Sequence, residues 1–103
     1  MFESYYRNII FKFLDNIKEG TIILNDDISK TFGSGNPKVT IEVVSPRFYR
    51  RAVLGGDLGF AESYAKSEWF TDNLTDLITI LIVNKENLSG LDIGWSFMSK
   101  LFA

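Results

Sequence analysis

A run of apolar side chains at spacings of three and four residues opens the chain and constrains its fold more than any other feature. Its members are Phe2, Tyr5, Tyr6, Ile9, Ile10, Phe13 and Ile17. On a helix these side chains form one continuous stripe. A helix that lies on a membrane carries a polar face rich in Lys and Arg, whereas Arg7, Lys12 and Asp15 make this face mixed in sign. The pattern therefore favours a helix packed on a core and ended by Gly20.

Three later segments are predicted as strands, because they are rich in β-branched residues or alternate apolar and polar side chains: 21–24, 29–32 and 38–44. In the last of them Val39, Ile41 and Val43 alternate with polar residues, which is the period of a half-buried strand. The segment 33–37 contains two glycines and a proline, so it predicts a turn. Together these segments predict an antiparallel meander.

Helices and one more strand fill the rest of the chain. Ser45 is placed to cap a helix that begins at Pro46, and Gly55 and Gly56 end that helix. The elements predicted after it are a short helix at 59–66, a strand at 68–71, a helix at 74–83 capped by Asn73, and a last helix after Ser89 and Asp92 with Leu91, Trp95, Met98 and Phe102 on one face. The order predicts one α+β domain, residues 1–103, with a small antiparallel or mixed sheet covered by helices.

Composition excludes several classes of function. The 103 residues carry 11 basic and 13 acidic side chains, which is not the basic excess of a nucleic-acid-binding surface. The chain has no cysteine and no histidine, so thiol chemistry and the commonest metal ligand and general base are absent. We see neither a signal peptide nor an apolar run of about 20 residues, and so expect a cytoplasmic protein.

Three short motifs resemble chemical sites, but their context argues against each. The glycines of 33–35 precede a proline and a strand, whereas a phosphate-binding loop opens a helix. The segment 91–94 echoes the first glycine motif of methyltransferases but lacks the further glycines and the acidic ribose ligand. Asp26 and Asp27 alone are too few ligands for calcium or magnesium. We therefore predict no catalytic residue, metal site or cofactor site on this chain.

A basic strip on the helix that begins at Pro46 is the strongest candidate site. Arg47, Arg50 and Arg51 are three and four residues apart and share one face. Arginine suits bidentate contacts with phosphate or carboxylate groups. The residues expected to contact a lipid or a neighbouring domain are Arg47, Arg50, Arg51, Glu62, Tyr64 and Trp69. The alternative is a solvated face whose arginines pair with Asp57, Glu62 or a neighbouring domain, with Tyr64 and Trp69 as core or interface aromatics.

The same stretch resembles the N-terminal region of the cyclopropane-fatty-acyl-phospholipid synthase family. The resemblance is carried in order by Arg-Phe-Tyr-Arg-Arg at 47–51, Leu-Gly-Gly-Asp-Leu-Gly at 54–59, Glu-x-Tyr at 62–64, Trp69, and the Asp-Asn-Leu helix start at 72–74. It runs from about residue 20 to 83 and is densest from 45 to 77. The chain departs from the family pattern at 65–67, where the family tends to have a bulkier residue and a glycine.

The resemblance implies a function in lipid modification. Members of this family are two-domain enzymes whose C-terminal methyltransferase domain binds S-adenosylmethionine and transfers its methyl group to unsaturated acyl chains of phospholipids. Residues 1–103 then correspond to a non-catalytic N-terminal accessory domain, and the catalytic domain is absent from this chain. The implied partners are that domain in cis, a phospholipid or membrane surface, and a second copy in a homodimer. The implied location is cytoplasmic and peripheral to the membrane.

Two alternatives remain open at this point. The order of elements is also similar to that of sterol-carrier-type lipid-binding modules, which suggests a stand-alone lipid carrier. Such a carrier needs an apolar cavity of several hundred Å³ between sheet and helices. The other alternative is a protein-interaction domain without a small ligand.

Overall fold

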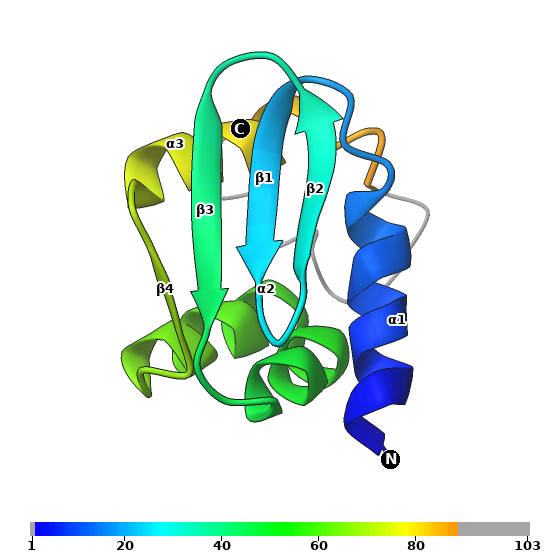
Figure 1. The fold of residues 1–103 in the computed structure, drawn as a ribbon, viewed down its shortest axis with the longest axis vertical. Helices are drawn as coiled ribbons and strands as arrows, with labels where there is room; N and C mark the ends of the chain where they lie inside the picture. The colour runs from blue at the N-terminus through cyan, green and yellow to red at the C-terminus, as the bar shows by residue number, and fades with distance from the viewer. Residues whose placement is uncertain (1, 89–103) are drawn as a thin grey trace.

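The computed structural model describes residues 2–88, which form an open four-stranded sheet and three helices (Figure 1). The helices are α1 (Phe2–Leu14), α2 (Arg47–Ala65) and α3 (Leu74–Val83). The strands are β1 (Gly20–Asn25), β2 (Ser29–Ser34), β3 (Lys38–Val43) and β4 (Trp69–Thr71). The predicted α+β class with a small helix-covered sheet is therefore confirmed. The helix predicted after Ser89 lies outside the described residues.

The sheet is mixed, so the predicted antiparallel meander is wrong in one pairing. The strand order is β2-β1-β3-β4, with β1 antiparallel to β2 but parallel to β3. Between β2 and β3 the chain crosses the start of β1 in only three residues, where the Thr21 amide donates to the Pro37 carbonyl at 2.9 Å. Parallel neighbours normally need a much longer connection, and this is why the pattern alone suggested a meander.

Helix α1 ends at Leu14, earlier than predicted. The Asn16 side-chain amide donates to the carbonyls of Lys12 and Phe13, at 3.0 and 3.3 Å, and so bonds carbonyls left free at the helix end. Gly20 is not a helix stop. It opens β1 with φ of 86°, and a side chain there would meet Ile80 at 2.7 Å.

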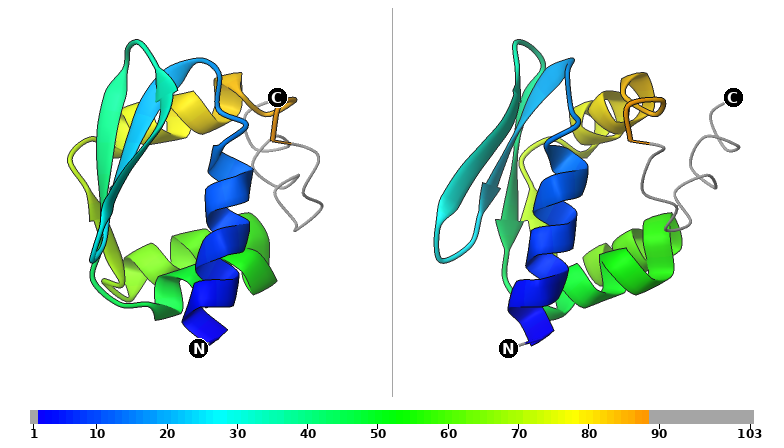
Figure 2. Two further views of the ribbon diagram at one scale, coloured as in Figure 1. Left: turned by 45° about the vertical axis from the view of Figure 1, so that its right-hand side comes forward. Right: turned by 90° about the vertical axis from the view of Figure 1, so that its right-hand side faces the viewer.

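All three helices lie on one side of the sheet, and the core fills the space between them (Figure 2). The α1 stripe is a packing face, because Ile10, Phe13 and Ile17 are buried. Tyr5, near the start of the same helix, is 62% exposed. The predicted cap of α3 is confirmed, since the Asn73 side chain accepts from the Asp76 amide at 3.0 Å. No helix in residues 2–88 is long and apolar enough to cross a membrane.

Helix α2 doubles back on itself, and this shape creates the candidate site. It begins at Arg47, one residue after the predicted Pro46, and the Ser45 hydroxyl accepts from the Arg47 amide at 3.3 Å. The break falls as predicted: Gly56 has φ of 61° and ψ of −139°, which are not helical. Beyond the break the second half packs against the first so closely that a side chain on Gly59 would lie 1.9 Å from the Arg51 carbonyl oxygen.

Candidate functional site

A groove runs along the solvent side of α2 and has a volume of about 690 Å³. It is lined by Arg47, Arg50, Arg51, Leu54, Gly55, Leu58, Gly59 and Glu62. The lining comes from both halves of the helix, so the groove depends on the break at Gly56. This volume lies within the usual range for ligand sites. The structure therefore brings all three predicted arginines and Glu62 into one depression.

Arg47 and Arg50 are the cations of this groove that stay unpaired within the described part of the chain. Both are exposed, and among residues 2–88 neither guanidinium has a hydrogen bond or an ion pair. They are three residues apart on one helix, so their side chains are neighbours. Two adjacent guanidinium groups that are free of carboxylates can bind phosphate oxygens.

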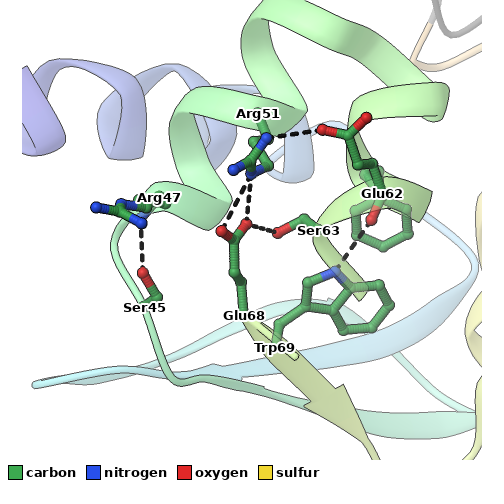
Figure 3. A network of polar contacts seen from close by, with 8 residues as sticks. Ser45, Arg47, Arg51, Glu62, Ser63, Glu68 and Trp69 are labelled. Carbon is green, nitrogen blue, oxygen red and sulfur yellow. Dashed lines mark hydrogen bonds and ion pairs between the residues drawn. The ribbon is translucent and has the colours of Figure 1, made fainter. Parts of the chain in front are cut away.

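Arg51 differs from these two because it is bonded to two carboxylates (Figure 3). Its Nε donates to Glu68 Oε1 and Oε2 at 2.9 and 3.1 Å, and its Nη1 donates to Glu62 Oε1 at 2.7 Å. The Ser63 hydroxyl donates to Glu68 Oε1 at 2.6 Å. Arg51 thus joins both halves of α2 to the segment that leads into β4. The pairing with Glu62 was predicted as the alternative to ligand binding, and the pairing with Glu68 was not predicted.

Glu68 remains ionised because its bonds outweigh its burial. Burial acts to raise the pKa of this carboxyl group, since it disfavours the charged form. Hydrogen bonds from Ser63 and Arg51, together with the positive charge of Arg51 and a smaller contribution from Arg47, hold the pKa below its ordinary value. The carboxylate is therefore a fixed negative charge beneath the groove, and it neutralises Arg51.

The remaining predicted residues divide between core and surface. Trp69 is 1% exposed, and its indole N–H donates to the Phe60 carbonyl at 3.1 Å, so it is a core residue that a surface ligand cannot reach. Tyr64 is 39% exposed and its ring lies 4.8 Å from that of Trp69. It is not among the lining residues of the groove. Asp57 is buried, and its carboxylate accepts from the Leu58 amide at 2.9 Å rather than from one of the three arginines.

Two leucines at the end of the groove were not predicted. Leu54 is 63% exposed and Leu58 is 61% exposed, one on each side of the break. Beside them Gly55 has no atom within 4 Å of the position where a side chain would begin. The available signal was the pair of Leu-Gly steps at 54–55 and 58–59, because a leucine beside a glycine at a chain reversal has little to pack against.

The gap between sheet and helices that residues 2–88 line gives no support to a carrier with an enclosed ligand. This apolar gap is lined by core residues such as Phe13, Ile22, Phe48 and Leu77, and its volume is about 20 Å³. That is close to the space for one water molecule, and it is far below what an acyl chain needs.

The acidic turn at Asp26 and Asp27 is bonded to other side chains. Arg7 Nη1 donates to Asp27 Oδ1 at 2.8 Å, and the Tyr49 hydroxyl donates to Asp26 Oδ2 at 2.7 Å. Burial and the Asp26 carboxylate both raise the pKa of Tyr49, so its hydroxyl stays protonated. The turn thereby ties α1 to α2. Within the described part of the chain, no three His, Cys, Asp or Glu side chains gather closely enough to hold a metal ion.

Comparison with known proteins adds no family. No protein-family model, no curated protein and no solved structure matches the chain.

Proposed function

We propose that this chain is a non-catalytic accessory domain of an enzyme resembling the cyclopropane-fatty-acyl-phospholipid synthases, and that it engages anionic phospholipid through the groove on α2. The observation that carries the proposal is the lining of the groove: at one end two guanidinium groups that have no partner in residues 2–88, and at the other two exposed leucines. A phospholipid has the matching chemistry, since its phosphate is anionic and its chains are apolar. The methyl donor, S-adenosylmethionine, belongs to the catalytic domain in this proposal.

The location of the groove supports the resemblance. The resemblance to the family is densest from residue 45 to 77, and the groove is lined only by residues between Arg47 and Glu62. The motif Arg-Phe-Tyr-Arg-Arg supplies the cations, and Leu-Gly-Gly-Asp-Leu-Gly supplies the break and both leucines. The residues that suggest lipid modification are therefore the residues that form the candidate site.

Binding to anionic vesicles tests the groove. We expect the chain to bind vesicles of equal parts phosphatidylcholine and phosphatidylglycerol, and to bind phosphatidylcholine alone much more weakly. Each arginine near an anionic surface contributes about 1 kcal/mol, so Arg47→Gln/Arg50→Gln should weaken binding about 25-fold in vesicle co-sedimentation. Added salt should weaken the wild type more than the variant.

A matched variant separates the groove from general charge. Lys12→Gln/Lys85→Gln also removes two positive charges, from exposed positions outside the groove. We expect this control to bind like the wild type. Equal losses of vesicle affinity in both variants would contradict a specific role for the groove. If the groove binds an acidic protein surface instead, the wild type should show no detectable vesicle binding.

The accessory role has its own test. The proposal predicts that the gene encodes an S-adenosylmethionine-dependent methyltransferase domain in the same reading frame, or in an adjacent gene. Co-purification of the two parts, with lower activity on vesicles when Arg47 and Arg50 are replaced, is the expected result. A natural gene that encodes only this domain, with no methyltransferase gene beside it, would count against the accessory role.

A further inference from the structure

The break in α2 forms a tip that points away from the rest of the domain. Gly56 reverses the chain, and Gly59 lets the second half lie against the Arg51 carbonyl. In the right-hand view of Figure 2, the green helix extends outward from the sheet and turns back at its far end. As far as residues 2–88 are concerned, the turn is therefore open to a large, flat partner.

This tip is apolar at its surface. Leu54 and Leu58 are each more than 60% exposed, and Gly55 beside them is open. The one charged residue in the segment 54–61 is Asp57, which is 5% exposed and so does not face the solvent. Exposed charges flank the pair, since Arg50 lies four residues before Leu54 and Glu62 four residues after Leu58. Large apolar side chains that are this exposed are costly in water and are stabilised when they enter an apolar medium.

The unpaired arginines lie at a suitable distance behind the tip. A helix rises 1.5 Å per residue, so Arg50 is about 6 Å and Arg47 about 10 Å from Leu54 along the axis. The headgroup layer on each side of a bilayer is about 5–8 Å thick, and interfacial segments bury their apolar face about 5–10 Å deep. Leucines that reach the top of the acyl chains would therefore place both guanidinium groups at the level of the phosphates.

We propose that the α2 tip inserts Leu54 and Leu58 into the interface of an anionic bilayer while Arg47 and Arg50 hold phosphate groups above them. This inference rests on the proposed function and adds how the domain is oriented and how deeply it enters. A bilayer fits better than one extracted lipid, because leucines that are this exposed cannot enclose a chain. It also fits better than a second copy, whose own Arg47 and Arg50 would meet the same charges across the contact.

The chain contains no cysteine, so one engineered cysteine reports on one position. We would label Leu54→Cys with the environment-sensitive fluorophore NBD and add vesicles of equal parts phosphatidylcholine and phosphatidylglycerol. The expected result is a blue shift with higher intensity, and quenching by lipids that carry a nitroxide high on the acyl chain. The same label on Ile28→Cys, an exposed apolar position in the turn between β1 and β2, should stay in water.

Affinity provides the second readout. We expect about tenfold weaker vesicle binding for Leu54→Ser and for Leu58→Ser, since each removes an inserted leucine. Ile28→Ser and Val83→Ser, at exposed apolar positions elsewhere, should bind like the wild type. Circular dichroism would confirm that each variant folds.

The outcomes separate the two proposals. Insertion is overturned if the wild type binds vesicles normally but the label at Leu54→Cys stays in water. It is also overturned if neither leucine variant loses affinity. In both cases the proposed function still stands. No binding of the wild type to anionic vesicles overturns both.

Discussion

The arginines on one face of α2 serve different purposes. In an inner network Arg51 is bonded to Glu62 and Glu68, and Glu68 also accepts from Ser63. In an outer pair Arg47 and Arg50 have no such partner among the described residues, although they line the same groove. The inner arginine therefore holds the fold together, and the outer pair is available to a ligand.

The glycines of α2 divide in the same way. Both line the groove, but a side chain on Gly59 would collide with the Arg51 carbonyl, whereas one on Gly55 would enter open space. Residue type alone does not distinguish Arg51 from Arg50, or Gly59 from Gly55. The contrast shows that a functional surface is recognised by groups whose bonding capacity the fold has left unused.

The largest expected effect separates the two glycines. Gly59→Ala places a methyl group within 1.9 Å of a backbone oxygen, so the two halves of α2 must move apart. We expect it to lower the free energy of unfolding by about 3 kcal/mol, measured by urea denaturation. Gly55→Ala meets no atom within 4 Å and should raise it by up to about 1 kcal/mol through helix propensity. Similar effects at both positions would contradict the close packing of the two halves.

The next effect separates the arginines. Arg51→Gln leaves the buried Glu68 carboxylate without its cation, and we expect a loss of about 2 kcal/mol in the free energy of unfolding. Arg50→Gln removes a charge that has no partner in residues 2–88, so its effect should stay within about 0.5 kcal/mol. In vesicle binding we expect the reverse order. If Arg50→Gln destabilised the fold as strongly as Arg51→Gln, the proposed division of α2 would be wrong.

A smaller effect tests the inner network by itself. Ser63 is fully buried, and its hydroxyl donates to Glu68 at 2.6 Å. Ser63→Ala removes one hydrogen bond and should lower the free energy of unfolding by about 1 kcal/mol. In the Arg51→Gln background we expect Ser63→Ala to cause a loss of different size, because Ser63 and Arg51 donate to the same carboxylate, that of Glu68. Strictly additive losses would argue that the three side chains do not act as one network.

Much of the fold could be predicted from the sequence, because the periodicity of apolar residues determines local structure. The alternation at 38–44 predicted β3, and the Asn73 cap predicted the start of α3, since both depend on neighbouring residues. The pairing of the strands could not be predicted from the sequence. Whether β3 lies beside β1 or β2 depends on a three-residue link that crosses the start of β1, and hydrophobic patterning does not encode that path.

The candidate site was predictable in part for the same reason. The helical spacing placed three arginines on one face, and the structure confirms that they line one groove. Which arginine is already paired depends on Glu68, 17 residues from Arg51 in sequence, and a helical pattern carries no information at that distance. The exposure of Leu54 and Leu58 depends on how sharply Gly56 turns the chain, so it also required the structure.

The smallest expected effect concerns pH and acts on the inner network only. Because the pKa of Glu68 is lower in the folded chain than its ordinary value, folding is favoured while the carboxyl group is ionised. This contribution is fully present above the ordinary pKa of 4.5 and is lost as the pH falls through the lower folded value. The wild type should therefore lose stability below about pH 4.5, beyond the loss caused by its other carboxylates.

Comparison with a variant isolates this contribution. We expect the urea midpoint of Glu68→Gln to fall less steeply with acid than that of the wild type, although the variant is less stable at neutral pH. Glu62→Gln, which removes the exposed carboxylate bonded to the same arginine, should keep the steep dependence. If both variants followed the wild-type pH profile, Glu68 would contribute no more than an ordinary surface carboxylate. The inner network would then not be the fixed set of charges that distinguishes Arg51 from Arg47 and Arg50.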